Sequence, residues 1–239
     1  VKINRNGKKA INLAADDELA TVRSGTDEHN VVMVSNLGRA CRFDLSSVRT
    51  QGRVSSGVRG IRLDDKDAAL AGMILTNDID TSVLTLSKQG MGKRTRLGKG
   101  EKVPTIRDGE QQYYDDGEAK SEMDGYRVTK RGGKGVITMN LNDGDVISRV
   151  HQIPDLADQL FLLSSKGVVI RISAIQTKET SGRSSKGTRV MELRSKNKDS
   201  FIDELIFSAR MPAILAEEIL TEKSSEDEEL VENTTSEEE

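Results

Sequence analysis

The chain has 239 residues, with 36 basic and 39 acidic groups and a formal net charge of −3. No apolar run approaches the roughly 20 residues that a membrane-spanning helix needs, so we expect no membrane partner. Cysteine occurs once, as Cys41, which excludes a framework of internal disulfides and fits a reducing, cytoplasmic location. The length suits one repeat array or one to two ordinary domains.

In chain order, the first recurring element is a glycine followed six residues later by a leucine. It occurs at Gly7–Leu13, Gly57–Leu63, Gly135–Leu141 and Gly187–Leu193, and the glycines are 50, 78 and 52 residues apart. A period near fifty indicates repeated structural units. We call these four segments the glycine-leucine elements.

A second element alternates with the first and consists of a short apolar run, a polar turn with glycine and another strand-like run. The turn glycines are Gly38, Gly90 and Gly167, and glycine supplies the positive φ that a tight β-hairpin requires. Each full unit then holds about four short strands, whose apolar face must be covered by a neighbouring unit, as in propellers. The sequence therefore predicts an all-β repeat domain over residues 1–208.

Three segments depart from the repeat. The spacing places an insertion at about 98–127, with an acidic core at 108–124, and we interpret it as a surface excursion because long loops in compact domains are usually functional or disordered. The apolar spacing over 209–223 predicts a short helix docked on the last unit. The low-complexity acidic tail over 224–239 lacks core-forming residues, so we expect it to be disordered.

The net charge conceals a strong asymmetry along the chain. Residues 217–239 hold eleven acidic groups and one lysine, whereas the other 216 residues hold 35 basic and 28 acidic groups. Without the insertion core the repeats carry a net charge of +13. A basic body with an acidic tail is typical of nucleic-acid interaction, and we expect the tail to compete with DNA for the basic surface.

The basic positions repeat in phase with the units. An arginine follows each hairpin glycine by four residues, and another precedes three of the glycine-leucine elements by four. Equivalent positions of stacked units share one curved surface, so this pattern predicts a row of phosphate contacts without sequence preference. The predicted DNA contacts are Arg42, Arg53, Lys93, Arg94, Lys130, Arg131, Gly132, Gly133, Lys134, Gly135, Arg171, Arg183 and Lys186.

The glycines among these contacts would let the backbone approach a phosphate closely. The chain contains four Phe, three Tyr and no Trp, so few aromatic platforms are present for stacking unpaired bases, and duplex DNA is the better target. A plainer interpretation remains, in which these positions are turn glycines with solvated basic neighbours.

The sequence contains little that indicates a catalytic site. The cysteine and histidines show no zinc-ligand spacing, and the glycine-rich stretches lack the Gly-Lys-Ser/Thr ending of a phosphate-binding loop. The acidic stretches that follow Leu63 and Leu141 are interpreted as turns capped by their own side chains. We therefore predict no catalytic residue, no metal and no cofactor.

Several of these segments together resemble one family. Thr129–Gly135, which reads TKRGGKG, is similar to the gyrase A box, Gln-Arg/Lys-Arg-Gly-Gly-Lys/Arg-Gly, although Thr129 stands where the box has glutamine. GVRGIRL at Gly57–Leu63 and GMGKRT at 90–95 are typical of the C-terminal domain of bacterial DNA gyrase A. The resemblance covers residues 1 to about 208, and it places a strict copy of the box before Val1.

The resemblance implies a β-pinwheel, a propeller-like array of four-stranded blades that exchange strands with their neighbours. It further implies that duplex DNA wraps or bends on a basic rim in support of negative supercoiling. The implied partners are the gyrase A catalytic core and the gyrase B ATPase, in a nucleoid-associated enzyme. The insertion at 98–127 departs from the compact blade of the family.

Two other functions stay open at this point. The C-terminal domain of topoisomerase IV, in which the box is degenerate, selects DNA substrates rather than wrapping them, and Thr129 keeps that reading possible. A blade-type scaffold for protein interactions would retain a protein partner and bind duplex DNA weakly.

Overall fold

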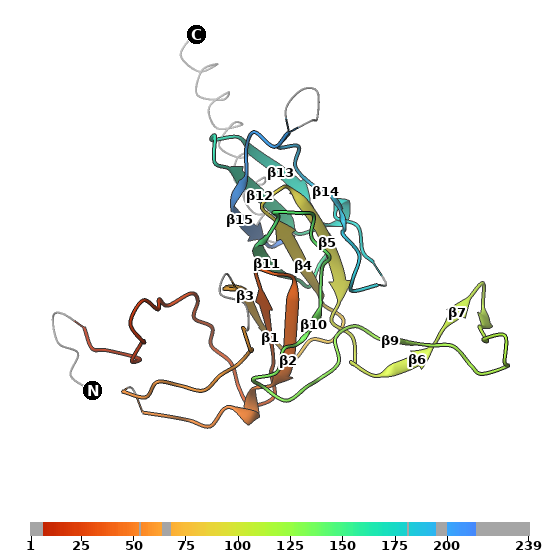
Figure 1. Ribbon diagram of the computed structural model, residues 1–239, viewed down its shortest axis with the longest axis horizontal. Helices are drawn as coiled ribbons and strands as arrows, with labels where there is room; N and C mark the ends of the chain where they lie inside the picture. Colours follow the sequence, from red (N-terminus) through yellow and green to blue (C-terminus); the bar gives the residue numbers. More distant parts are fainter. Residues whose placement is uncertain (1–6, 53, 64–67, 181, 195–199, 214–239) are drawn as a thin grey trace, which may run out of the picture.

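A computed structural model describes residues 7–52, 54–63, 68–180, 182–194 and 200–213. Nearly all regular structure in these residues is strand (Figure 1), with two short 3-10 turns, η1 (Leu45–Ser47) and η2 (Ala174–Gln176). The all-β prediction is confirmed. No helix in the described part is long and apolar enough to cross a membrane.

The strands form three main antiparallel sheets, which we call the first, second and third blade. Their strand orders are β10–β2–β1–β3, β11–β4–β5–β14 and β13–β12–β15. The blades follow one another along the molecule and do not close into a ring (Figure 1).

The first blade comprises β1 (Asn30–Ser35), β2 (Arg39–Asp44), β3 (Leu70–Thr76) and β10 (Val136–Ile137). The second comprises β4 (Ser82–Ser87), β5 (Met91–Arg96), β11 (Ile147–Ile153) and β14 (Thr188–Arg189), and the third β12 (Gln159–Ser164), β13 (Val169–Ser173) and β15 (Leu205–Met211).

The blades exchange strands, as a pinwheel requires. The hairpin β1–β2 receives β10, although β4 and β5 lie between them in the chain, and the hairpin β4–β5 receives β14. Val136 pairs with Ala40 in the first case and Thr188 with Gly92 in the second, so both partners shift by 52 residues. The donated strands are the third and fourth glycine-leucine elements, and the period seen in the sequence is therefore the period of strand exchange.

Apolar clusters join successive blades. Val32 and Val34 of β1 pack with Ile147 of β11 between the first and second blades. Leu84 of β4 packs with Leu160 of β12 between the second and third. No blade buries its apolar face alone. Removing apolar surface from water contributes about 25 cal/mol per Å², so the stacking of neighbouring blades is favourable.

The insertion forms an arm that projects away from the blades (Figure 1). Its strands are β6 (Lys102–Pro104), β7 (Ile106–Arg107), β8 (Glu110–Gln111) and β9 (Ser121–Met123), with β6 paired to β9 and β7 to β8. Tyr113 and Tyr114 are exposed on the arm, whereas Tyr126 at its base is buried in the core between the first two blades.

At the C-terminal end, β15 extends three residues past the predicted boundary of 208. It therefore occupies the first residues of the predicted helix over 209–223. The rest of that prediction from residue 214, and the predicted tail over 224–239, lie outside the described residues.

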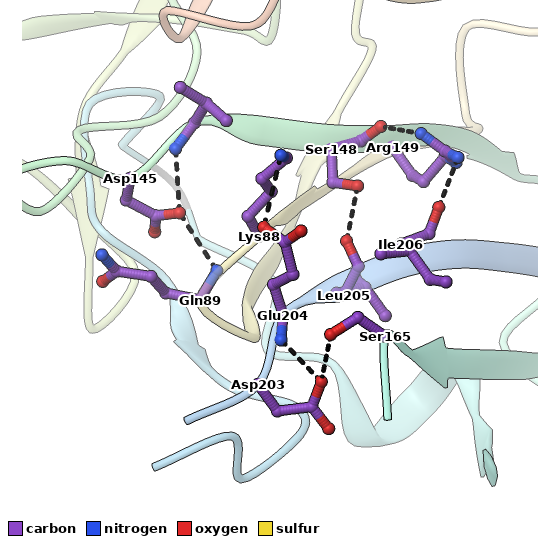
Figure 2. Close-up of polar contacts among 11 residues, drawn as sticks. Lys88, Gln89, Asp145, Ser148, Arg149, Ser165, Asp203, Glu204, Leu205 and Ile206 are labelled. Atoms are coloured by element: carbon purple, nitrogen blue, oxygen red, sulfur yellow. Dashed lines mark hydrogen bonds and ion pairs between the residues drawn. The ribbon is translucent and has the colours of Figure 1, made fainter. Parts of the chain in front are cut away.

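Acidic side chains hold the tips of two hairpins (Figure 2). The Asp145 carboxylate accepts hydrogen bonds from the backbone N–H groups of Gln89 (3.1 Å) and Val146 (2.9 Å). The Asp203 carboxylate accepts from the N–H groups of Lys166 (3.1 Å) and Glu204 (2.8 Å). Asp145 belongs to the acidic stretch after Leu141, and its turn-capping role agrees with the sequence interpretation.

His151 of β11 provides a test of the packing between the second and third blades. Its Nε2 lies 2.6 Å from Ser208 Oγ of β15, and burial, followed by Arg210, Arg149 and Arg23, lowers its pKa from 6.5 to about 4. The native state therefore keeps this histidine neutral, and the stability that it contributes is fully present above pH 6.5 and is lost progressively as the pH falls from 6.5 to about 4. We expect ~2 kcal/mol of unfolding free energy to be lost between pH 7 and pH 5 through this group.

Urea unfolding at both pH values measures this loss. His151→Gln removes the titrating group, so the variant should show a smaller loss of stability over the same pH interval. An equal loss in parent and variant would assign the pH dependence to the carboxylates.

Candidate nucleic-acid interface

The turn before β10 carries the basic residues of the box-like segment. Lys130 and Lys134 are exposed. Arg131 is half-buried, and its guanidinium donates hydrogen bonds to the carbonyl oxygens of Ser47 (3.1 Å) and Arg59 (3.4 Å). Arg131 thus fastens the turn to the segment that precedes β3, and the two lysines are presented at the surface.

An equivalent turn precedes β14 in the second blade. Arg183 and Lys186 lie 52 residues after Arg131 and Lys134, in the same relation to the donated strand. Lys186 is exposed and its Nζ donates to Asn142 Oδ1 at 3.0 Å, whereas Arg183 is half-buried. Adjacent blades therefore each present a basic turn at one rim, which we call the basic rim.

A residue of the outer hairpin strand holds each turn in place. In the second blade, Lys93 Nζ donates to the Gly182 carbonyl (3.0 Å), the Arg183 carbonyl and Ser185 Oγ (3.2 Å). Lys93 is fully buried, and burial together with the nearby Arg183 lowers its pKa to about 8. In the first blade the equivalent residue is Cys41, whose Sγ contacts Thr129 Oγ1 at 3.5 Å.

Two arginines predicted to bind DNA are also interior residues. Arg42 and Arg94 have only 3% and 5% of their surface exposed. Arg42 Nη1 donates to the carbonyls of Leu97 (3.1 Å), Gly98 (2.7 Å) and Tyr126 (2.9 Å). Burial lowers the Arg42 pKa, an effect that Asp44 and Asp124 oppose.

Arg94 makes a corresponding set of contacts in the second blade. Its Nε donates to the Thr177 carbonyl at 2.9 Å, and its Nη1 pairs with Glu179 at 2.9 Å. Arg42, Arg94 and Lys93 each donate several hydrogen bonds to protein acceptors. We therefore correct the prediction for these three residues and place them in the interior rather than on the DNA surface.

The glycines of the box-like segment also have structural tasks. Gly135 has φ +69°, and a Cβ there would lie 2.2 Å from the carbonyl oxygen of Ala40. Gly132 donates its N–H to the Gly60 carbonyl at 2.6 Å, and the Gly133 carbonyl accepts from Arg62 N–H at 2.9 Å. The backbones of these glycines therefore contact neighbouring segments, and their approach to a phosphate stays a prediction.

Arg39 and Arg62 are surface cations that the sequence analysis did not select. Together with Lys134 they line a hollow of about 220 Å³, whose walls include Leu37 and Leu63. Arg39 also donates to the Gly135 carbonyl at 3.3 Å. Arg62 lies within the second glycine-leucine element, but its place beside the basic turn of a distant segment could not be read from sequence spacing.

Two predicted contacts remain, Arg171 and Arg53. Arg171 is exposed on β13 and its guanidinium lies over the Phe161 ring, 5.6 Å from the centroid. Arg53 lies outside the described residues. The residues that the structure brings to the basic rim are Lys130, Lys134, Lys186, Arg39 and Arg62, and Arg131 and Arg183 are partly exposed in the same two turns.

The blade array and its basic rim define a propeller-like domain of the kind found in type II topoisomerases. The DNA gyrase C-terminal domain family, described as a beta-propeller, matches residues 1–24, 29–77, 81–107, 120–154 and 158–202. The chain belongs to this family. The unmatched residues 108–119 form the outer part of the arm.

Curated relatives agree with this assignment. The chain is 30% identical over 201 residues to the DNA gyrase A protein of Haloquadratum walsbyi, a match that covers 84% of this chain and 20% of the relative. It is 33% identical over 192 residues to the DNA gyrase A protein of Lawsonia intracellularis, covering 79% of this chain and 20% of the relative. The chain thus spans about a fifth of the length of these relatives.

Solved structures share the fold at low sequence identity. A C-terminal domain of DNA topoisomerase IV superposes with a TM-score of 0.66 at 19% identity, covering 85% of this chain and 53% of that one. A DNA gyrase A C-terminal domain superposes with a TM-score of 0.65 at 18% identity, covering 87% and 59%. The fold alone therefore does not separate the two enzymes, whereas the family match and the relatives in sequence point to gyrase A.

Proposed function

We propose that this domain binds duplex DNA without sequence preference along the basic rim. The observation that carries the proposal is the repetition of the basic turn at equivalent positions of the first and second blades, around Lys134 and Lys186. Cations at these positions suit a phosphate backbone, because phosphate contacts supply affinity without reading bases.

A curved path for the DNA follows from the same repetition. Successive blades are stacked side by side, so a duplex that contacts the turn of one blade and then the turn of the next must follow the rim. The hollow bounded by Arg39, Arg62 and Lys134 offers a further site for a backbone phosphate beside the first of these turns. Bending a duplex costs of order 1–6 kcal/mol for a site of 20–30 base pairs, which several charge-assisted contacts can offset.

In the whole enzyme, such bending would present a DNA segment to the gyrase A catalytic core, with the gyrase B ATPase as the further partner, in support of negative supercoiling. This role rests on membership of the family rather than on contacts in this chain. Selection of DNA substrates, as in a topoisomerase IV domain, is the alternative, and a supercoiling assay of the whole enzyme separates the two.

A comparison of two double variants tests where DNA binds. Lys134→Ala with Lys186→Ala removes one exposed cation from each basic turn, and should weaken binding of a random-sequence duplex about tenfold at low salt. Lys102→Ala with Arg107→Ala removes the same charge from the exposed arm and serves as the matched control. Fluorescence anisotropy measures both affinities, and equal weakening by the two double variants would contradict binding at the basic rim.

A further inference from the structure

The base of the arm lies beside the basic rim, between its two basic turns. A hollow of about 520 Å³ is bounded by Glu122 and Met123 of β9, by β10 and by residues 182–184 of the second turn. The first turn ends with Lys134 just before β10, and Lys186 follows the part of the second turn that lines the hollow. A duplex that contacts both turns would therefore pass over this hollow, which we call the rim hollow, and alongside the arm.

A second hollow adjoins the same arm strand on the side of the second blade. It has a volume of about 180 Å³ and lies between β9 and the end of β5. The charged groups that line it are the guanidinium of Arg96 and three carboxylates, those of Glu122, Asp124 and Glu179. Arg96 is itself paired with Asp80 at 2.5 Å. We call this site the acidic hollow, and its carboxylates repel a phosphate backbone.

Arg183 gives the rim hollow the opposite character. Its side chain lines the hollow, and its Nη1 is buried with no hydrogen-bond partner among the described residues. A buried donor without an acceptor carries a free-energy cost, which a new acceptor can remove. A backbone phosphate that enters the rim hollow would supply both the acceptor and the matching charge.

Backbone hydrogen bonds give the arm a defined shape. Thr105 N–H donates to the Lys120 carbonyl (2.9 Å), Lys120 N–H to the Gln112 carbonyl (2.8 Å) and Gln112 N–H to the Thr105 carbonyl (2.9 Å). Two hairpins branch from this closed ring of bonds. One is β7–β8, whose turn residues Asp108 and Gly109 both have positive φ, 52° and 83°, as a tight hairpin turn requires. The arm is therefore an ordered projection that can stand beside a duplex as a barrier.

The outer part of the arm is strongly acidic. Residues 108–119 contain five acidic groups and no basic group, and all five acidic side chains are exposed. A DNA duplex carries one negative charge for roughly every 1.7 Å of its axis, and repulsion between exposed charges acts over about 8 Å at physiological salt. The family match omits the same residues, 108–119, so this acidic barrier is a feature that the chain adds to the shared fold.

We propose that the arm fixes the path of the bound duplex, which runs across the rim hollow and is kept out of the acidic hollow by the charge of the outer arm. This inference rests on the proposed function and adds the side of the arm on which the DNA passes. The rim hollow joins the two basic turns and offers Arg183, whereas the acidic hollow and residues 108–119 present carboxylates. Potentials of opposite sign beside one ordered projection direct a polyanion to one side of it.

Cleavage of DNA by a chelated iron ion attached to single cysteines of the full chain tests this path. Ser184→Cys places the reagent in the wall of the rim hollow, and Val103→Cys places it in the wall of the acidic hollow. Cys41 is buried, so the parent treated with the same reagent gives the background. The label at position 184 should cleave a bound random-sequence duplex well above this background, and the label at position 103 should not.

Neutralising the outer arm should open the second path. The substitutions are Asp108→Asn, Glu110→Gln, Asp115→Asn, Asp116→Asn and Glu118→Gln. In the labelled Val103→Cys chain they should raise cleavage above background and tighten duplex binding about threefold at low salt, because the repulsion is removed.

The matched control replaces five exposed acids of the N-terminal segment by their amides, namely Asp16, Asp17, Glu18, Asp27 and Glu28. It should leave cleavage from position 103 at background. Equal cleavage from positions 103 and 184 in chains with the native arm, or the same change in both amide variants, would overturn the proposal. Anisotropy on the same samples reports binding separately, and a parent that does not bind the duplex would contradict the proposed function itself.

Discussion

Arg42→Ala should lower the free energy of unfolding by about 3–5 kcal/mol, because it removes a buried cation and leaves its acceptors without their donor. Three carbonyl oxygens from the base of the arm, those of Leu97, Gly98 and Tyr126, converge on Arg42 Nη1, and Asn30 Oδ1 accepts from its Nε at 2.8 Å. An alanine leaves these oxygens in a buried site without a cation, so the first blade and the base of the arm should separate.

Arg171→Ala is the matched control, since Arg171 follows its hairpin glycine by the same four residues but is exposed. This substitution should change stability by ~0.5 kcal/mol or less. Urea unfolding measures both variants. If Arg42→Ala were as stable as the parent, the buried guanidinium would not hold the arm to the blade, and its assignment to the interior would be wrong.

Gly135→Val should cost about 3–5 kcal/mol and hinder docking of β10 on β2. Two effects combine, because a β-branched residue is strained at φ +69° and its Cβ would lie 2.2 Å from the Ala40 oxygen. The backbone of Ala40 is fixed by its pairing with β1, so the clash cannot be relieved by a side-chain rotation.

Gly144→Val separates the two effects. Gly144 has φ +71°, but nothing lies within 4 Å of a built Cβ, so this variant carries only the backbone strain of roughly 1–2 kcal/mol. Thermal and urea unfolding of both variants give the difference. Equal destabilisation by the two would show that backbone conformation alone, and not strand docking, requires glycine at position 135.

The repeat architecture could be predicted from the sequence because successive blades have glycines at equivalent positions. Gly38 and Gly90 form equivalent turns, and Gly135 and Gly187 begin equivalent donated strands, so a spacing of 52 residues carries through the fold. That strands pass between blades came from the family resemblance, since spacing alone does not reveal which hairpin receives which element.

The residues of the candidate site could be predicted from the sequence only in part, for a physical reason. Repetition in phase shows that two residues are equivalent, but not whether they face solvent. Arg42 and Arg94 are equivalent and both buried, whereas Arg171 of the third blade is exposed. The acceptors of Arg42 Nη1 lie 55 to 84 residues away in the chain. They are backbone carbonyls, which every residue carries, so the sequence does not show which of them will accept a hydrogen bond. Arg39 and Arg62 were missed because the rim is assembled from segments that strand exchange brings together.

The salt dependence of DNA binding tests the central claim, that the basic rim neutralises the phosphates of a duplex. Anisotropy titrations with random-sequence duplexes over a salt series should give a log–log slope near −5 if ~6 phosphates are neutralised, with the same affinity for unrelated sequences. An affinity that does not change with salt, or a strong preference for one short sequence, would contradict the account.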